Sequence, residues 1–113
     1  MLSASNRLKK GHEITRVYRR GKYGGAGILS VKSYSTGRGE SRAVVIVGKK
    51  VSKRAVVRNK IRRRLSSILR DKWQTVRPGY DIVVTVHQEI SDEPAKILEE
   101  ALVKALSHSG ATT

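Results

Sequence analysis

The 113-residue sequence has no cysteine and no phenylalanine, one tryptophan and two prolines. Without cysteine the chain can form neither a disulfide nor a thiolate metal site, and it has no cysteine nucleophile. It contains no apolar run of the roughly 18 residues that a membrane-spanning helix requires. Its first residues lack the apolar centre of a signal peptide. We therefore expect a cytoplasmic protein that has no membrane partner.

Acidic residues are scarce and unevenly placed. The chain has 24 Lys and Arg against 9 Asp and Glu, which gives a formal net charge of +15. Residues 1–70 hold 20 of these bases but only two acids, Glu13 and Glu40, so this part carries +18 and residues 71–113 carry −3. No acid lies between Ser41 and Arg70. This segregation predicts one surface that binds nucleic acid and another that is an ordinary solvated face.

Hydrophobic spacing and turn residues divide the chain into six elements. The predicted helices cover residues 11–20 and 54–73 and a last segment that opens at 91–94, where Ser91 is a candidate cap and residues 97–106 supply an apolar face. The predicted strands cover residues 28–34, 41–48 and 80–86, and the glycines of 22–27 predict a loop. The order α-β-β-α-β-α predicts an α+β sandwich in which helices pack on one mixed sheet, within a single domain over residues 1–113.

The predicted helix 54–73 has one apolar stripe and one cationic face. At about 100° per residue, the apolar stripe consists of Val57, Ile61, Leu65 and Ile68. The opposite side carries Asn59, Arg62, Arg63, Ser66 and Arg70. Solvated helix faces usually mix charges of both signs, which allows ion pairs between residues four apart, but this face has no acid. We therefore expect the helix to bind a nucleic acid.

The same charge pattern fits proteins of several kinds. A structural ribosomal or other RNA-scaffolding protein would carry it, and so would a nucleoid or regulatory DNA-binding protein. Catalysis by the protein itself is disfavoured, because hydrolysis of a phosphodiester needs metal-binding carboxylates or an acid–base pair. The acids are few, and His12, His87 and His108 are far apart in the sequence without metal-ligand spacing.

The basic segment also resembles a known family. The pattern KK-x₇-RN-x-I-x-R, from Lys49 to Arg63, is similar to the signature of the protein subunit of bacterial ribonuclease P. The segments NRLKKGHEITRVYRRGK (6–22), SRAVVIVGKK (41–50) and PGYDIVVTV (78–86) resemble other parts of that family, so the resemblance covers nearly the whole chain. It implies the family's α+β sandwich (ribosomal protein S5 domain 2-like), with a left-handed crossover between parallel strands.

The resemblance implies a function in the maturation of transfer RNA. In this family the catalyst is an RNA subunit with bound Mg²⁺, and the protein binds that RNA and the 5′ leader of precursor tRNA; DNA is not an expected partner. The residues implied to bind the RNA subunit are Lys49, Lys50, Lys53, Arg54, Arg58, Asn59, Lys60, Arg62, Arg63 and Arg70. Those from 58 to 63 are also implied to help order metal near the cleavage site. The residues implied to line the leader cleft are Ile14 and Tyr18 of the first helix and Val31 of the first strand.

The sequence departs from the family pattern at a few of these positions. Ser66 stands where the family usually has another Arg, and we expect Arg63 or Arg70 to substitute for it. Ile14 replaces a usual Phe, and His87 stands where a basic residue is usual.

Overall fold

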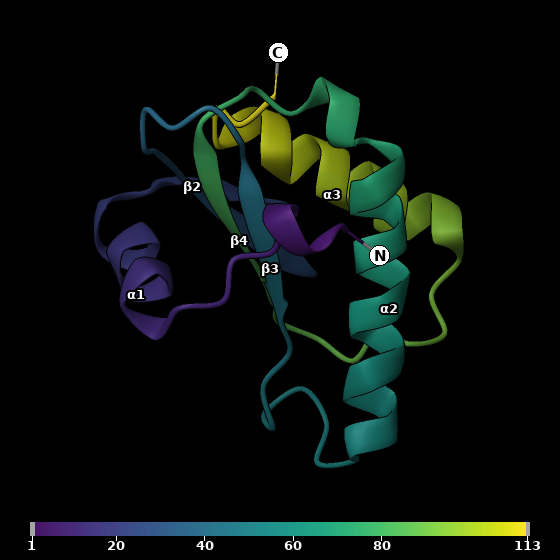
Figure 1. The fold of residues 1–113 in the computed structure, drawn as a ribbon. Helices are drawn as coiled ribbons and strands as arrows, with labels where there is room; N and C mark the ends of the chain where they lie inside the picture. The colour runs from purple at the N-terminus through teal and green to yellow at the C-terminus, as the bar shows by residue number, and fades with distance from the viewer. Residues whose placement is uncertain (1, 113) are drawn as a thin grey trace.

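The elements of the chain follow the predicted order, with one additional strand. The computed structural model describes residues 2–112 (Figure 1). The helices are α1 (Gly11–Arg20), α2 (Ala55–Asp71) and α3 (Ala95–His108), with short 3-10 turns η1 (Ala4–Asn6) and η2 (Trp73–Thr75). The strands are β1 (Lys22–Gly25), β2 (Leu29–Ser35), β3 (Arg42–Ile46) and β4 (Tyr80–Val86). The predicted α+β class is confirmed.

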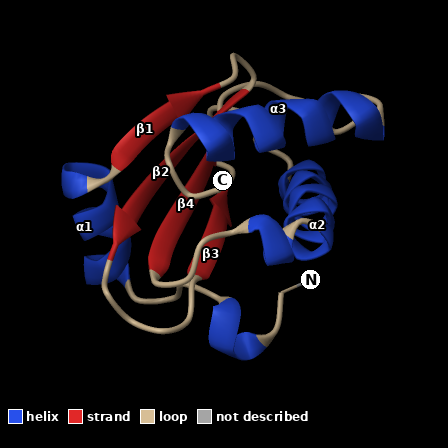
Figure 2. Ribbon diagram, turned by 90° about the horizontal axis from the view of Figure 1, so that it is seen from above, coloured by secondary structure: helices blue, strands red, loops and turns tan. Residues whose placement is uncertain are grey.

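The four strands form one mixed sheet in the order β1-β2-β4-β3. β2 pairs antiparallel with both β1 and β4, whereas β3 pairs parallel with β4. Helix α1 covers one face of the sheet, and α2 and α3 lie on the other (Figure 2). The chain passes from β3 to its parallel neighbour β4 through α2, as the resemblance implies; the handedness of this crossover stays a prediction.

The sheet separates two apolar clusters, because side chains alternate between its faces. Leu29 and Val31 of β2 join the larger cluster beneath α2 and α3, whereas Tyr34 packs in the smaller cluster beneath α1. The larger cluster is filled from the helices by Ile61, Leu65, Leu69, Leu98, Leu102 and Leu106. Nothing in the described part of the chain has both the length and the apolar character of a membrane-crossing helix.

Helix α2 buries its predicted stripe, with a shift towards its C-terminal end. Ile61 and Leu65 are fully buried as predicted, Leu69 is buried as well, and Val57 and Ile68 are only partly covered. Two details predicted for the last helix are wrong. Ile97 is 44% exposed, because α3 turns it away from the sheet. Ser91 does not cap the helix, since Pro94 occupies the N-cap position and no side chain bonds there.

The predicted loop at residues 22–27 is wrong for residues 22–25, where the structure has the edge strand β1. Gly24 of this strand is buried against the last turn of α3. A Cβ on Gly24 would overlap the carbonyl oxygen of Ala105 and lie 2.6 Å from the backbone nitrogen of Ser109. The glycine therefore permits a close approach of strand and helix.

Replacing Gly24 with Ala should destabilise the protein by about 1–3 kcal/mol, because the added methyl group meets backbone that cannot move aside cheaply. Urea unfolding would measure this. The matched control is Gly39→Ala, since a Cβ at Gly39 meets no atom within 4 Å. Equal unfolding midpoints for the two variants would contradict the close packing of β1 against α3.

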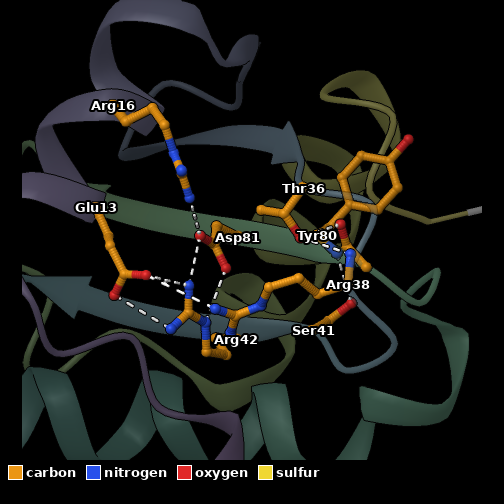
Figure 3. A network of polar contacts seen from close by, with 9 residues as sticks. Glu13, Arg16, Thr36, Arg38, Ser41, Arg42, Tyr80 and Asp81 are labelled. Atoms are coloured by element: carbon orange, nitrogen blue, oxygen red, sulfur yellow. Dashed lines mark hydrogen bonds and ion pairs between the residues drawn. The ribbon is translucent and has the colours of Figure 1, made fainter.

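A largely buried guanidinium, that of Arg42, joins α1 to the sheet. Arg42 of β3 donates from Nη1 and Nη2 to the two carboxylate oxygens of Glu13 on α1, at 3.1 and 2.8 Å. It also donates from Nε and Nη2 to Asp81 of β4, at 3.0 and 2.8 Å (Figure 3). Arg16 of α1 donates to Asp81 as well, at 3.2 Å, and its guanidinium lies 5.0 Å from the centre of the Tyr34 ring.

The bonds between Arg42 and Glu13 shift the pKa values of these two groups. The hydrogen bond from Arg42 holds the pKa of Glu13 below its ordinary value of 4.5, against the opposing effect of burial. Hydrogen bonds to Asp81 and then to Glu13 raise the pKa of Arg42. Both carboxylates are engaged by arginines at this point of the fold, since Arg16 also pairs with Asp81 and Arg38 lies 3.8 Å from Glu13.

Stability should fall in acid because of Glu13. Its pKa is lower in the folded chain than in the unfolded chain, so its contribution is complete above the ordinary value of 4.5 and is lost as the pH falls below it. At pH 7, Glu13→Gln should reduce the free energy of unfolding by about 1–3 kcal/mol, and the difference from wild type should shrink below pH 4. Urea unfolding at several pH values measures both effects. The same loss from the exposed control Glu100→Gln, or a loss independent of pH, would contradict this role.

Candidate nucleic-acid interface

The segment that leads into α2 is an exposed basic loop, at the lower end of the molecule in Figure 1. It carries Lys49, Lys50, Lys53 and Arg54, all of which are exposed. Its turn is held by Ser52, whose side-chain oxygen accepts a bond from the Arg54 backbone and whose carbonyl oxygen accepts one from Arg58. Among the described residues, none of these five cations forms an ion pair with a carboxylate.

The predicted cationic face of α2 lines a groove. The groove has a volume of about 500 Å³ and lies between α2, the open edge of β3 and the N-terminal segment. From α2 it is lined by Asn59, Arg62, Arg63, Ser66 and Leu69. Arg62 donates a short hydrogen bond to the side-chain oxygen of Asn59, one turn away. Of the two arginines expected to substitute at Ser66, Arg63 lies in the same groove and Arg70 does not line it.

Lys60 and Arg70 differ from the other candidates because each has a carboxylate neighbour. Lys60 points to the connection between β4 and α3, where its Nζ lies 2.9 Å from Asp92. The hydrogen bond from Lys60 lowers the pKa of Asp92, which is itself fully exposed. Arg70 lies 3.8 Å from the adjacent Asp71. Since exposed ion pairs contribute little to stability, both cations can exchange these partners for a phosphate.

The two leader candidates on α1 lie at the edge of its contact with the sheet. Ile14 is partly buried in the smaller cluster, and Tyr18 is 37% exposed. The Tyr18 hydroxyl is 2.9 Å from the hydroxyl oxygen of Thr85, and Lys32 donates to the Tyr18 carbonyl oxygen at 2.7 Å. The Lys32 ammonium also lies 5.9 Å from the centre of the Tyr18 ring. Tyr18 therefore presents an aromatic surface beside a cation.

The prediction that Val31 lines this site is wrong. Val31 is fully buried in the cluster beneath α2 and α3, on the other face of the sheet from α1. Successive residues of a strand face opposite sides, so the site beside α1 is formed by its neighbours. On β2 these are Ser30 and Lys32, and Ser30 shares a 2.8 Å hydrogen bond with His87 at the end of β4.

Several residues at these surfaces were not predicted. Tyr23 of β1 is directly opposite Lys32 in the strand register, which places it on the same face, and it is 61% exposed. Arg7 and Lys9 line the α2 groove from the N-terminal segment. The resemblance covers residues 6–22, but it does not indicate that Arg7 and Lys9 face α2. That position follows only from the folded structure. Among residues 2–112, no three His, Asp or Glu side chains gather as a metal site would require.

Comparison with known proteins agrees with this architecture. The family model described as Ribonuclease P matches residues 2–110. The ribonuclease P protein component of Pseudanabaena sp. is 36% identical and the alignment covers 91% of this chain and 97% of that protein. The corresponding component of Cyanothece sp. is 32% identical, with 89% and 95% covered.

Solved structures show the same fold. The RNase P protein of Staphylococcus aureus superposes with a TM-score of 0.83 at 23% identity, over 96% of this chain and 98% of that one. The RNase P protein from Thermotoga maritima gives a TM-score of 0.76 at 26% identity, over 86% and 91%. On the family match and the curated relatives, the chain belongs to the ribonuclease P protein family, the protein subunit of a tRNA-processing endoribonuclease.

Proposed function

We propose that this chain binds the catalytic RNA subunit of ribonuclease P through α2 and the basic loop before it, and binds the 5′ leader of precursor tRNA beside α1. In this way it promotes the Mg²⁺-dependent removal of the leader. The observation that carries the proposal is the distribution of carboxylates. Glu13 and Asp81 are turned inwards to Arg42, while Arg62, Arg63 and the loop cations have no carboxylate partner among the described residues.

Binding at the α2 surface is electrostatic in origin. Each Lys or Arg that neutralises a phosphate releases condensed counterions, which favours association at low salt. Arginine also binds phosphate in a defined orientation, because its planar guanidinium can donate two hydrogen bonds to one phosphate. The cations of α2 and its preceding loop would therefore allow RNA strands to approach one another with less repulsion.

Mg²⁺ is assigned to the RNA in this proposal. Within residues 2–112 no group of three acidic or histidine side chains is placed to hold a metal ion, and the proposed role of the protein uses its cations. When bound to RNA, Mg²⁺ supplies the charge that activates and stabilises the reacting oxygens. Arg58, Arg62 and Arg63 would neutralise phosphates near that site, and none of them forms an ion pair with a carboxylate among the described residues.

The leader would lie across the sheet face that α1 leaves uncovered. Tyr18 and Tyr23 offer rings on which unpaired bases can stack, and Lys32 lies beside both. Stacking of this kind tolerates any base, because every base has an aromatic face. This site therefore predicts leader binding with little sequence preference.

Salt dependence tests the RNA-subunit surface. The logarithm of the binding constant for the RNA subunit should fall steeply with the logarithm of salt concentration, and Arg63→Gln should make the slope less negative by about 1. The matched control is Lys72→Gln, because Lys72 lies 2.9 Å from Glu99 and has a carboxylate of its own. Filter binding at several salt concentrations gives the slopes. A wild-type slope near zero, or equal changes in both variants, would contradict the proposal.

Leader binding is tested at Tyr18. Tyr18→Ala should weaken the binding of precursor tRNA to the holoenzyme by about fivefold or more, since one stacked base is worth roughly 1–3 kcal/mol. Tyr18→Phe keeps the ring and should stay close to wild type. Both variants should bind leaderless tRNA as the wild-type holoenzyme does. An equal loss with and without the leader would remove Tyr18 from the leader site.

A further inference from the structure

The floor of the α2 groove is apolar, which phosphate binding alone does not require. Leu2, Leu8 and Leu69 line it and are nearly fully buried, with 7%, 2% and 1% of their surfaces exposed. Ala43–Val45 of β3, the outermost strand of the sheet, complete the floor. A duplex presents phosphates and sugars to a protein, so an apolar floor would make no favourable contact with it.

The edge of β3 also presents an unused backbone donor to the groove. The Leu8 backbone N–H donates to the Ala43 carbonyl oxygen at 3.0 Å, so the backbone of Ala43 faces the N-terminal segment. By the alternation of a strand, the N–H and carbonyl of Val45 point to the same side. Within residues 2–112 the Val45 N–H has no hydrogen-bond partner on that side. A polar group that enters the groove can therefore be recognised at its floor.

Cations line the groove on both sides. Arg7 and Lys9 lie on the N-terminal segment, and Arg62 and Arg63 lie on α2. Arg7 is held in place, since its Nε donates to the Leu2 carbonyl oxygen at 2.9 Å. Among the residues that the structure describes, no acidic side chain lines the groove. An apolar peptide would leave these cations without partners, whereas a nucleotide offers a base for the floor and phosphates for the sides.

We propose that the groove between the N-terminal segment and α2 is a seat for one unstacked nucleotide of the RNA subunit. The base lies on the leucines and the β3 edge, where the Val45 N–H and the Ser66 hydroxyl can bond to its edge. The flanking phosphates bind Arg7 and Lys9 on one side and Arg62 and Arg63 on the other. The planar guanidinium of an α2 arginine can stack on the base, in the way that an aromatic side chain does at other RNA-binding sites. The inference rests on the proposed binding of the RNA subunit and specifies how one surface achieves it.

Filling the groove tests the seat without changing charge. Ser66→Phe places a ring where the base would lie and should weaken RNA-subunit binding by about tenfold to a hundredfold, the value of one stacked base. The slope of binding against salt should not change, because no cation is removed. The control Ser67→Phe is the next residue of α2, outside this groove, and should bind within about twofold of wild type. If circular dichroism shows that both proteins are folded and Ser66→Phe binds as tightly as the wild type, the proposal is overturned.

A cross-linking experiment gives an independent test with a variant that barely alters the fold. Because the chain has no cysteine, Ser66→Cys introduces a unique thiol that can carry an azidophenacyl photo-cross-linker. In the holoenzyme with bound precursor tRNA, this probe should react with one or two adjacent nucleotides of the RNA subunit. Ser67→Cys with the same probe should not reach those nucleotides.

The outcomes separate the seat from the broader function. Cross-links spread over many positions, or formed only to the leader, would overturn the nucleotide seat while leaving RNA-subunit binding intact. Failure of the wild-type chain to bind the RNA subunit at all would instead refute the proposed function on which the seat rests.

Discussion

The bonds of Arg42 to Glu13 and Asp81 are the interaction on which the rest of the structure depends. They join α1, β3 and β4 at a buried point, so they set where α1 lies on the sheet and which part of that face stays uncovered. They also withdraw two carboxylates from the surface. A buried pair of this kind adds less stability than its close contacts suggest, because both charges must leave water. Its larger consequence is positional, since it defines one wall of the proposed leader site.

Both proposed RNA sites rest on the same sheet, because Tyr18 of α1 bonds to Thr85 of β4, and β4 pairs with β3, which lines the α2 groove. On one side of β3, Val44 and Ile46 pack in the cluster beneath α1. At its open edge, the backbone near Val45 forms the floor of the α2 groove. A leader bound beside α1 and an RNA subunit bound along α2 would thus meet a single rigid support. Under the proposal, this support would fix the relative positions of the two RNA strands.

The sequence predicted the elements whose signals are local. Helix α1 and strand β4 have the predicted bounds, because α1 shows clear helical spacing with Gly21 at its end and β4 is a continuous apolar run after Pro78-Gly79. Strand β1 was missed because Gly24 serves close packing against α3, which is a tertiary contact. Val31 was placed on the wrong face because a shift of one residue in a strand reverses every side chain. The pairing of Lys60 with Asp92, 32 residues away, and the position of Arg7 opposite α2 depend on the whole fold.

Cleavage at limiting Mg²⁺ tests most directly whether the carboxylate-free surface lets RNA pack around its own ions. A bacterial ribonuclease P RNA and precursor tRNA would be incubated at a Mg²⁺ concentration too low for the RNA alone, with and without the chain. We predict that the folded chain restores formation of a leader-sized product, and that a high Mg²⁺ concentration largely removes the difference. An unchanged rate at limiting Mg²⁺, although the chain is folded and present in excess, would contradict this explanation.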